Sequence, residues 1–85
     1  MQVKIEIPEY SPDNGLRLEW EDNFKVSSSV ENNIVTITAN QEGLISLARH
    51  LLTLAQSEVP ARSHIHLDDL NSLETDSTEL IFEKI

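Results

Sequence analysis

Cysteine is absent from the 85-residue sequence, which excludes disulfide bonds, thiolate metal sites and a cysteine nucleophile. Glycine is almost as scarce: the chain has only Gly15 and Gly43, so no glycine-rich phosphate-binding loop can form. The serines at 27–29 lie in a strand-like run and not on a strand-to-helix turn, which argues against a serine hydrolase. With no other catalytic group of residues in the sequence, we expect neither enzymatic activity nor a cofactor.

Long apolar runs are missing as well. A helix that spans a bilayer requires about 20 predominantly apolar residues, and no stretch of this chain approaches that length. The first ten residues, MQVKIEIPEY, lack the basic segment and apolar core of a signal peptide. These two features and the lack of cysteine predict a cytoplasmic protein that does not associate with membranes.

Basic residues are few. Six Lys and Arg stand against 15 Asp and Glu, which gives a net charge of -9 at neutral pH. A surface of this charge repels the phosphates of nucleic acids and attracts basic proteins. Acidic surfaces also serve solubility alone, so the charge predicts the character of a partner without requiring one. We expect no binding of nucleic acid.

Alternating apolar and polar residues predict extended structure through most of the first 39 residues. The predicted strands are residues 3–7, 16–21, 24–30 and 34–39. Turn-forming residues separate these runs, with a tight turn expected at ENN (31–33), because asparagine tolerates positive φ. Short connections of this kind favour an antiparallel meander. Ser28 falls on an inward-facing position, which either weakens its strand or marks a place where a neighbouring segment packs closely.

The spacing of apolar residues changes at Asn40 from a period of two to a period of 3.6, which predicts an amphipathic helix over about residues 41–57. Asn40 itself is a favourable N-cap. Its apolar stripe consists of Leu44, Leu47, Ala48, Leu51, Leu54 and Ala55, widened by Ile45 and Leu52. The residues that fall largely outside the stripe are Ser46, Arg49, His50, Thr53 and Gln56. We therefore expect His50 on the solvated surface of the helix.

The last 30 residues contain two further runs of strand type. HIHL (64–67) is followed by the polar loop DDLNSLETDS. The consecutive apolar residues 80–82 predict a final strand that is either covered on both faces or central in the sheet. The sequence therefore predicts one α+β domain over residues 1–85. We expect two layers: an antiparallel sheet of five or six strands, with one amphipathic helix, about 41–57, packed on one face.

The stretch SHIHLDD (63–69) holds two of the three histidines and is the candidate functional site. On a strand, His64, His66 and Asp68 would share one face, and such a set could hold a metal ion, although H-x-H is a weak motif. The same face with the following loop could instead bind arginines and lysines of a partner protein. That surface would consist of His64, His66, Asp68, Asp69, Glu74 and Asp76. As a third possibility, the two adjacent aspartates only cap the turn after the strand.

Taken together, NNIVTITANQEGLISLARHLLTLAQ, HIHLDD and STELIFEK resemble the immunity protein 32 family of bacterial polymorphic-toxin systems. The resemblance runs from about Gly15 to Lys84 and is carried by the order of strand, leucine-rich helix, H-x-H-L-D and closing S-x-E-L strand. His64, His66, Leu67 and Asp68 match the family motif. We expect a glycine just before the first motif histidine, where this chain has Arg62 and Ser63.

The resemblance implies an α+β protein without enzymatic activity that is encoded beside a toxin and neutralises it by tight binding. With a charge of -9, the expected toxin is basic, and a nuclease-type toxin fits that description. Two alternatives remain at this point. One is a small metal-binding protein that uses His64, His66 and Asp68, and the other is a structural subunit that pairs through an exposed sheet edge.

Overall fold

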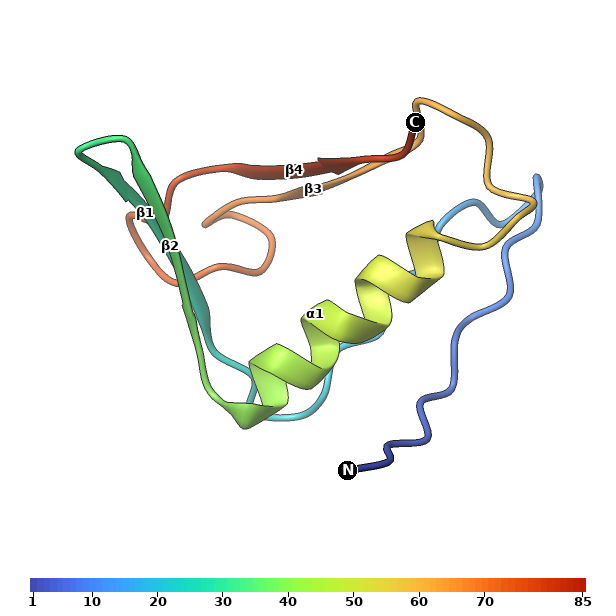
Figure 1. Ribbon diagram of the computed structural model, residues 1–85, viewed down its shortest axis with the longest axis horizontal. Coiled ribbons are helices and arrows are strands. Elements are labelled where there is room, and N and C mark those ends of the chain that lie inside the picture. Colours follow the sequence, from blue (N-terminus) through green and yellow to red (C-terminus); the bar gives the residue numbers. More distant parts are fainter.

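The computed structural model describes all 85 residues and contains one helix and four strands. In chain order these are β1 (Val26–Glu31), β2 (Ile34–Ala39), α1 (Gln41–Leu54), β3 (His64–Leu67) and β4 (Leu80–Glu83). β1 pairs with β2 and β3 pairs with β4, giving two separate antiparallel sheets of two strands each. In Figure 1 the β1–β2 hairpin, the β3–β4 pair and α1 form three sides of a triangle. The α+β class is confirmed, and the predicted sheet of five or six strands is wrong.

The β1–β2 hairpin forms where the sequence predicts it. Its two-residue turn, Asn32 and Asn33, has φ values of 51° and 63°, the left-handed conformation that asparagine tolerates. Such a turn matches the twist of the flanking strands and fixes their register, with Glu31 opposite Ile34 and Val26 opposite Ala39. The predicted tight turn is confirmed.

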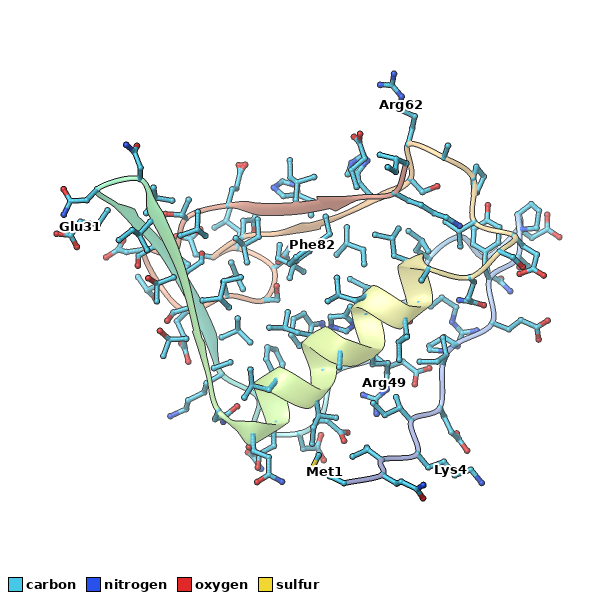
Figure 2. All side chains as sticks on the ribbon, viewed as in Figure 1. Met1, Lys4, Glu31, Arg49, Arg62 and Phe82 are labelled. Carbon is cyan, nitrogen blue, oxygen red and sulfur yellow. The ribbon has the colours of Figure 1, made fainter.

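The strand predictions for residues 3–7 and 16–21 are wrong. Both segments are irregular, and no strand pairs with either of them. Polar side chains of α1 bond some of their backbone groups instead. Arg49 donates from Nε to the carbonyl of Glu6 (3.2 Å) and from Nη1 to the carbonyl of Glu19 (3.3 Å). Figure 2 shows Arg49 on the side of α1 that faces the N-terminal segment. One guanidinium thus ties two distant parts of the chain to the helix.

Two further side chains complete this arrangement. Gln56, just after α1, donates from Nε2 to the carbonyl of Pro8 (3.0 Å) and accepts the amide of Tyr10 at Oε1 (3.0 Å). Ser46 accepts the amide of Glu21 (2.9 Å). Five backbone groups of the first 21 residues are therefore bonded by side chains of α1 and of Gln56, which a periodicity argument does not detect.

The start of α1 agrees with the prediction, and its end does not. Asn40 is the N-cap: its Oδ1 accepts the amide of Gly43 at 2.8 Å. The helix ends at Leu54, before the predicted end at 57. At the C-cap, the amide of Ala55 is shared between the carbonyls of Leu51 (3.0 Å) and Leu52 (3.2 Å), which tightens the last turn.

The buried face of α1 is largely the polar one, contrary to the prediction. Its buried residues are Gly43, Ser46, His50, Thr53 and Leu54. Leu44, Leu51 and Leu52 of the predicted apolar stripe are exposed, Leu44 to 58%. Hydroxyl groups tolerate this burial because they bond within the helix: Ser46 Oγ donates to the carbonyl of Glu42 (2.8 Å) and Thr53 Oγ1 to that of Arg49 (2.7 Å).

Gly43 explains how the first turn of α1 approaches the hairpin. A Cβ atom at this position would lie 2.5 Å from the carbonyl oxygen of Lys25 and 2.9 Å from a methyl carbon of Val26. The backbone oxygen cannot yield as a flexible side chain can, so only glycine allows this contact. The glycine therefore positions α1 against the start of β1.

His50 lies in the interior and not on the solvated surface, so that prediction is wrong. Its side chain is 1% exposed and meets the ring of Trp20 edge-on, with ring centroids 4.3 Å apart. Neither Nδ1 nor Nε2 has a hydrogen-bond partner. Burial, and secondarily the positive charge of Arg49, lower the pKa of His50 from 6.5 to about 4. The ring is therefore neutral near pH 7.

The core is small. It consists of Val26, Leu54, Val59, Ile65, Leu67 and Leu73, with partly buried aromatic and aliphatic side chains around them. Ser28 is buried beside this core because the loop before β4 packs along β1. The amide of Thr78 donates to the carbonyl of Ser28 (3.0 Å), and the hydroxyl of Ser28 donates back to the carbonyl of Thr78. Close packing by a neighbouring segment, one of the two alternatives for Ser28, is the one observed.

Candidate functional site

β3 divides its residues between the core and solvent as the alternation predicts. Ile65 and Leu67 are buried, and His64 and His66 are exposed on the other face. The antiparallel register with β4 sets Glu83 opposite His64 and Ile81 opposite His66 on that exposed face. We call the exposed surface formed by His64, His66, Glu79, Ile81 and Glu83 the histidine face.

The last strand is neither covered on both faces nor central, so that prediction is wrong: β4 pairs with β3 alone and leaves Ile81 exposed. Its side chain is 62% exposed, while its neighbours Leu80 and Phe82 pack against the core. Sequence reasoning therefore missed three residues of the histidine face: Glu79, Ile81 and Glu83. The signal was present in ELIFEKI, where these three alternate with the inward residues, but the apolar run at 80–82 obscured it.

His66 lies among carboxylates. Its Nε2 is 3.2 Å from Oε1 of Glu79 and 3.6 Å from Oδ2 of Asp68, with the imidazole 44% exposed. When protonated, the ring forms an ion pair with both carboxylates. The pair with Glu79 is open to solvent and contributes little to folding stability, so these two groups can exchange partners with an incoming protein.

The two adjacent aspartates organise the loop after β3, which agrees with the capping possibility. Oδ1 of Asp68 accepts the amides of Leu70 (2.9 Å) and Asn71 (3.0 Å), the geometry of an Asx turn. Oδ2 of Asp69 accepts the amide of Asp76 (3.3 Å) across the loop. These carboxylates hold the shape of the loop whatever else they contact.

The six residues predicted to bind a partner do not form one cluster. His64 and His66 share the histidine face, and Asp68 lies at its end, where it meets His66. Asp69 and Asp76 are joined to each other within the loop. Glu74 lies apart, where the loop meets β1: its amide donates to the carbonyl of Val26 (2.9 Å).

The metal alternative has no support from the geometry. No group of three or more His, Asp and Glu side chains is arranged to hold a metal ion. The ring of His64 contacts the carbonyl oxygen of Arg62, 3.4 Å from Nδ1. His64, His66 and Asp68 therefore share a face without forming a ligand set.

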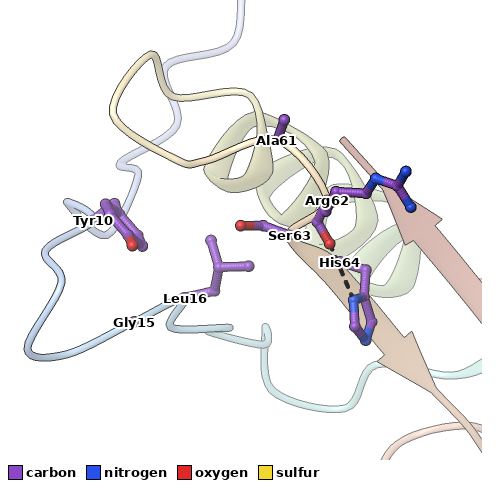
Figure 3. Close-up of a pocket in the computed structure, with 7 residues that line it drawn as sticks. All are labelled: Tyr10, Gly15, Leu16, Ala61, Arg62, Ser63 and His64. Carbon is purple, nitrogen blue, oxygen red and sulfur yellow. Dashed lines mark hydrogen bonds between the residues drawn. The ribbon is translucent and has the colours of Figure 1, made fainter. Parts of the chain in front are cut away.

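A shallow hollow with a volume of about 580 Å³ lies beside His64 (Figure 3). It is bounded on one side by Tyr10 and Leu16 and on the other by Arg62 and His64. Arg62 has φ 78°, in the left-handed region that favours glycine. Arg62 therefore adopts a backbone conformation that costs a residue other than glycine some strain.

The match to known families decides how this geometry is interpreted. A family model described as Immunity protein 32 matches residues 34–85, from the start of β2 to the end of the chain. This is more than half of the 85 residues. The chain belongs to the immunity protein 32 family. Neither a curated protein nor a solved structure matches the chain.

Membership of the immunity protein 32 family implies that the partner is a toxin. The matched region contains β2, α1 and both strands of the histidine face, and the N-terminal segments that Arg49 and Gln56 bind lie outside it.

α1, with 14 residues, is too short to cross a bilayer, and no helix of the structure is long and apolar enough to span a membrane.

Proposed function

We propose that this protein binds a cognate toxin and neutralises it without chemistry of its own, in the cytoplasm of the cell that produces the toxin. The observation that supports the proposal is the match of residues 34–85 to the immunity protein 32 family. Its test is to purify the toxin encoded by the adjacent gene and to measure its binding to this chain. Tight binding that blocks the toxin's activity is the expected result.

The proposed binding surface is the histidine face, extended by Asp68 at its end. Ile81 gives it an exposed apolar centre, and Glu79, Glu83 and the two histidines surround that centre. An apolar anchor ringed by polar groups is the usual composition of a protein-binding surface. Asp69, Glu74 and Asp76 extend the acidic character along the neighbouring loop. Such a surface suits arginines and lysines on the toxin.

The proposed toxin is basic and of the nuclease type. A protein of net charge -9 is drawn to a surface that binds nucleic acid and can cover it by charge complementarity. Recovery of an acidic or pore-forming toxin from the adjacent gene would make the nuclease assignment wrong. That result would leave the proposed immunity function unchanged, because neutralisation by binding does not depend on the type of toxin.

Charge reversal tests the surface. We expect Glu79→Lys combined with Glu83→Lys to weaken toxin binding at least tenfold, with a larger loss at low salt because screening is then weaker. The matched control is Glu9→Lys with Glu58→Lys, which changes the net charge equally at two exposed positions elsewhere. Isothermal titration calorimetry at two salt concentrations measures both pairs. Equal losses for the two double variants would place the toxin on another face.

A further inference from the structure

The outer edge of β2 is the long unpaired strand edge of this fold. β2 runs for six residues, and all but the last are exposed. β1, its neighbour, is protected on its other side, where the amides of Glu74 and Thr78 donate to the carbonyls of Val26 (2.9 Å) and Ser28 (3.0 Å). No segment of the chain pairs with the corresponding side of β2.

The hydrogen bonds of β1 show which residues of β2 direct their backbone groups outward. In an antiparallel pair, opposed residues alternate between bonding each other and pointing away. Val26 and Ser28 point away from β2, since their carbonyls bond the loop before β4. Their partners Ala39 and Ile37 therefore point away from β1, and so does Val35. These three residues present unpaired N–H and C=O groups along one edge.

This edge lacks the features that usually keep strands apart. Natural edge strands are protected by charged residues, proline or a bulge. Residues 32–41 contain none of Asp, Glu, Lys, Arg or Pro and form the longest uncharged run of a chain that is 25% charged. β1 and β2 pair in continuous register without a bulge. The edge is therefore open to another strand.

Apolar side chains accompany the open backbone. Val35 is 61% exposed and Ile37 40%, and Val30 lies opposite Val35 on the same face of the hairpin and is exposed too. A two-stranded hairpin is marginally stable in water, and additional strands with a shared apolar face stabilise it. A strand added at β2 would both satisfy the backbone and cover these side chains.

We propose that β2 pairs antiparallel with β2 of a second copy of this chain, giving a four-stranded sheet across a two-fold axis at Thr36. Val35 of each copy then lies opposite Ile37 of the other copy. Each of these two pairs exchanges two backbone hydrogen bonds. Thr36 faces Thr36 on the other side of the sheet, a favourable cross-strand pair. The strand is complementary to itself in this register.

Charge favours a second copy over a basic toxin as the occupant of this edge. A basic partner is attracted by carboxylates, and residues 32–41 offer none. Two copies of a chain with net charge -9 repel each other, and the uncharged edge is where they can approach with the least repulsion. Dimerisation should therefore strengthen as salt is added, opposite to the salt dependence expected for a basic toxin.

Sedimentation velocity of the full-length protein, from about 1 µM to about 1 mM, tests the proposal. We expect a concentration-dependent dimer that tightens with added salt. Val35→Pro removes an outward N–H without breaking a bond to β1 and should weaken dimerisation more than tenfold. Val35→Thr keeps the N–H and the branched shape and should dimerise like the wild type.

Hydrogen exchange gives a second readout that needs no variant. The amides of Val35 and Ile37 should become more protected as the wild-type concentration rises, while the amide of Thr36, which already bonds β1, should not change. A monomer over the whole concentration range would overturn the proposal, as would a dimer with unprotected Val35 and Ile37. Neither measurement involves the toxin, so failure here leaves the proposed immunity function untouched.

Discussion

His50→Leu is expected to raise the free energy of unfolding at pH 7.5 by about 1–3 kcal/mol, although it replaces a side chain in the core. The imidazole is 1% exposed, and neither of its nitrogens has a hydrogen-bond partner, so both are desolvated without compensation. Leucine has a similar volume and no polar atom, and it can still pack against Trp20. Urea denaturation of the two proteins measures the difference.

The same substitution should change how stability depends on pH. The pKa of His50 in the folded protein is about 4, below the value of 6.5 for the unfolded chain, so the unfolded state takes up the proton first. The wild type therefore loses about 3 kcal/mol of stability as the pH falls from 6.5 to about 4, and the leucine variant is spared this loss. His64→Leu, at an exposed position, is the control and should follow the wild type. Parallel pH profiles for His50→Leu and the wild type would mean that the ring is solvated.

Arg49→Met should release the N-terminal segments and lower the free energy of unfolding by about 2–3 kcal/mol. Methionine keeps much of the apolar stem but loses the bonds to the carbonyls of Glu6 and Glu19, together with the ion pair between Nη2 and Glu21 (3.7 Å). Hydrogen exchange should accelerate in residues 1–21 more than in β3 and β4. Urea denaturation supplies the overall loss.

Two controls separate geometry from charge at this position. Arg49→Lys retains the positive charge, but a single ammonium group cannot bond two carbonyls as the planar guanidinium does, so most of the loss should persist. Arg17→Met removes an arginine that is exposed and should change stability by less than about 0.5 kcal/mol. If Arg49→Lys behaved like the wild type, charge alone would account for the role of Arg49.

Local signals predicted the parts of the fold that depend on neighbours in sequence. Asparagines at 32 and 33 specify the hairpin turn, and Asn40 specifies the start of α1. What failed depends on distant contacts. Residues 3–7 alternate like a strand, but no strand pairs with them and the carbonyl of Glu6 accepts from Arg49 of α1 instead. No pattern within the segment distinguishes the two cases. The face that α1 buries also depends on a distant contact, the close approach of Gly43 to the carbonyl of Lys25 and to Val26.

About half of the candidate site could be predicted from the sequence. Alternation in HIHL correctly separates His64 and His66 from Ile65 and Leu67. The other half consists of Glu79, Ile81 and Glu83, whose alternation is visible in the sequence. What places them beside His64 and His66 is the register of β3 with β4, which joins segments separated by a loop and has no signature in either strand alone. Asp68 and Asp69 look equally suited to capping and to recognition in the sequence, and their backbone bonds are visible only in three dimensions.

The central claim, neutralisation of a toxin by binding, is tested most directly by co-expression. The toxin domain encoded by the adjacent gene is placed under an inducible promoter in a host that lacks this chain. With the chain co-expressed, we predict that growth is restored and that the two proteins co-purify as a stable complex. Cells that die regardless of the chain, or that survive without any complex between the two proteins, would contradict the claim.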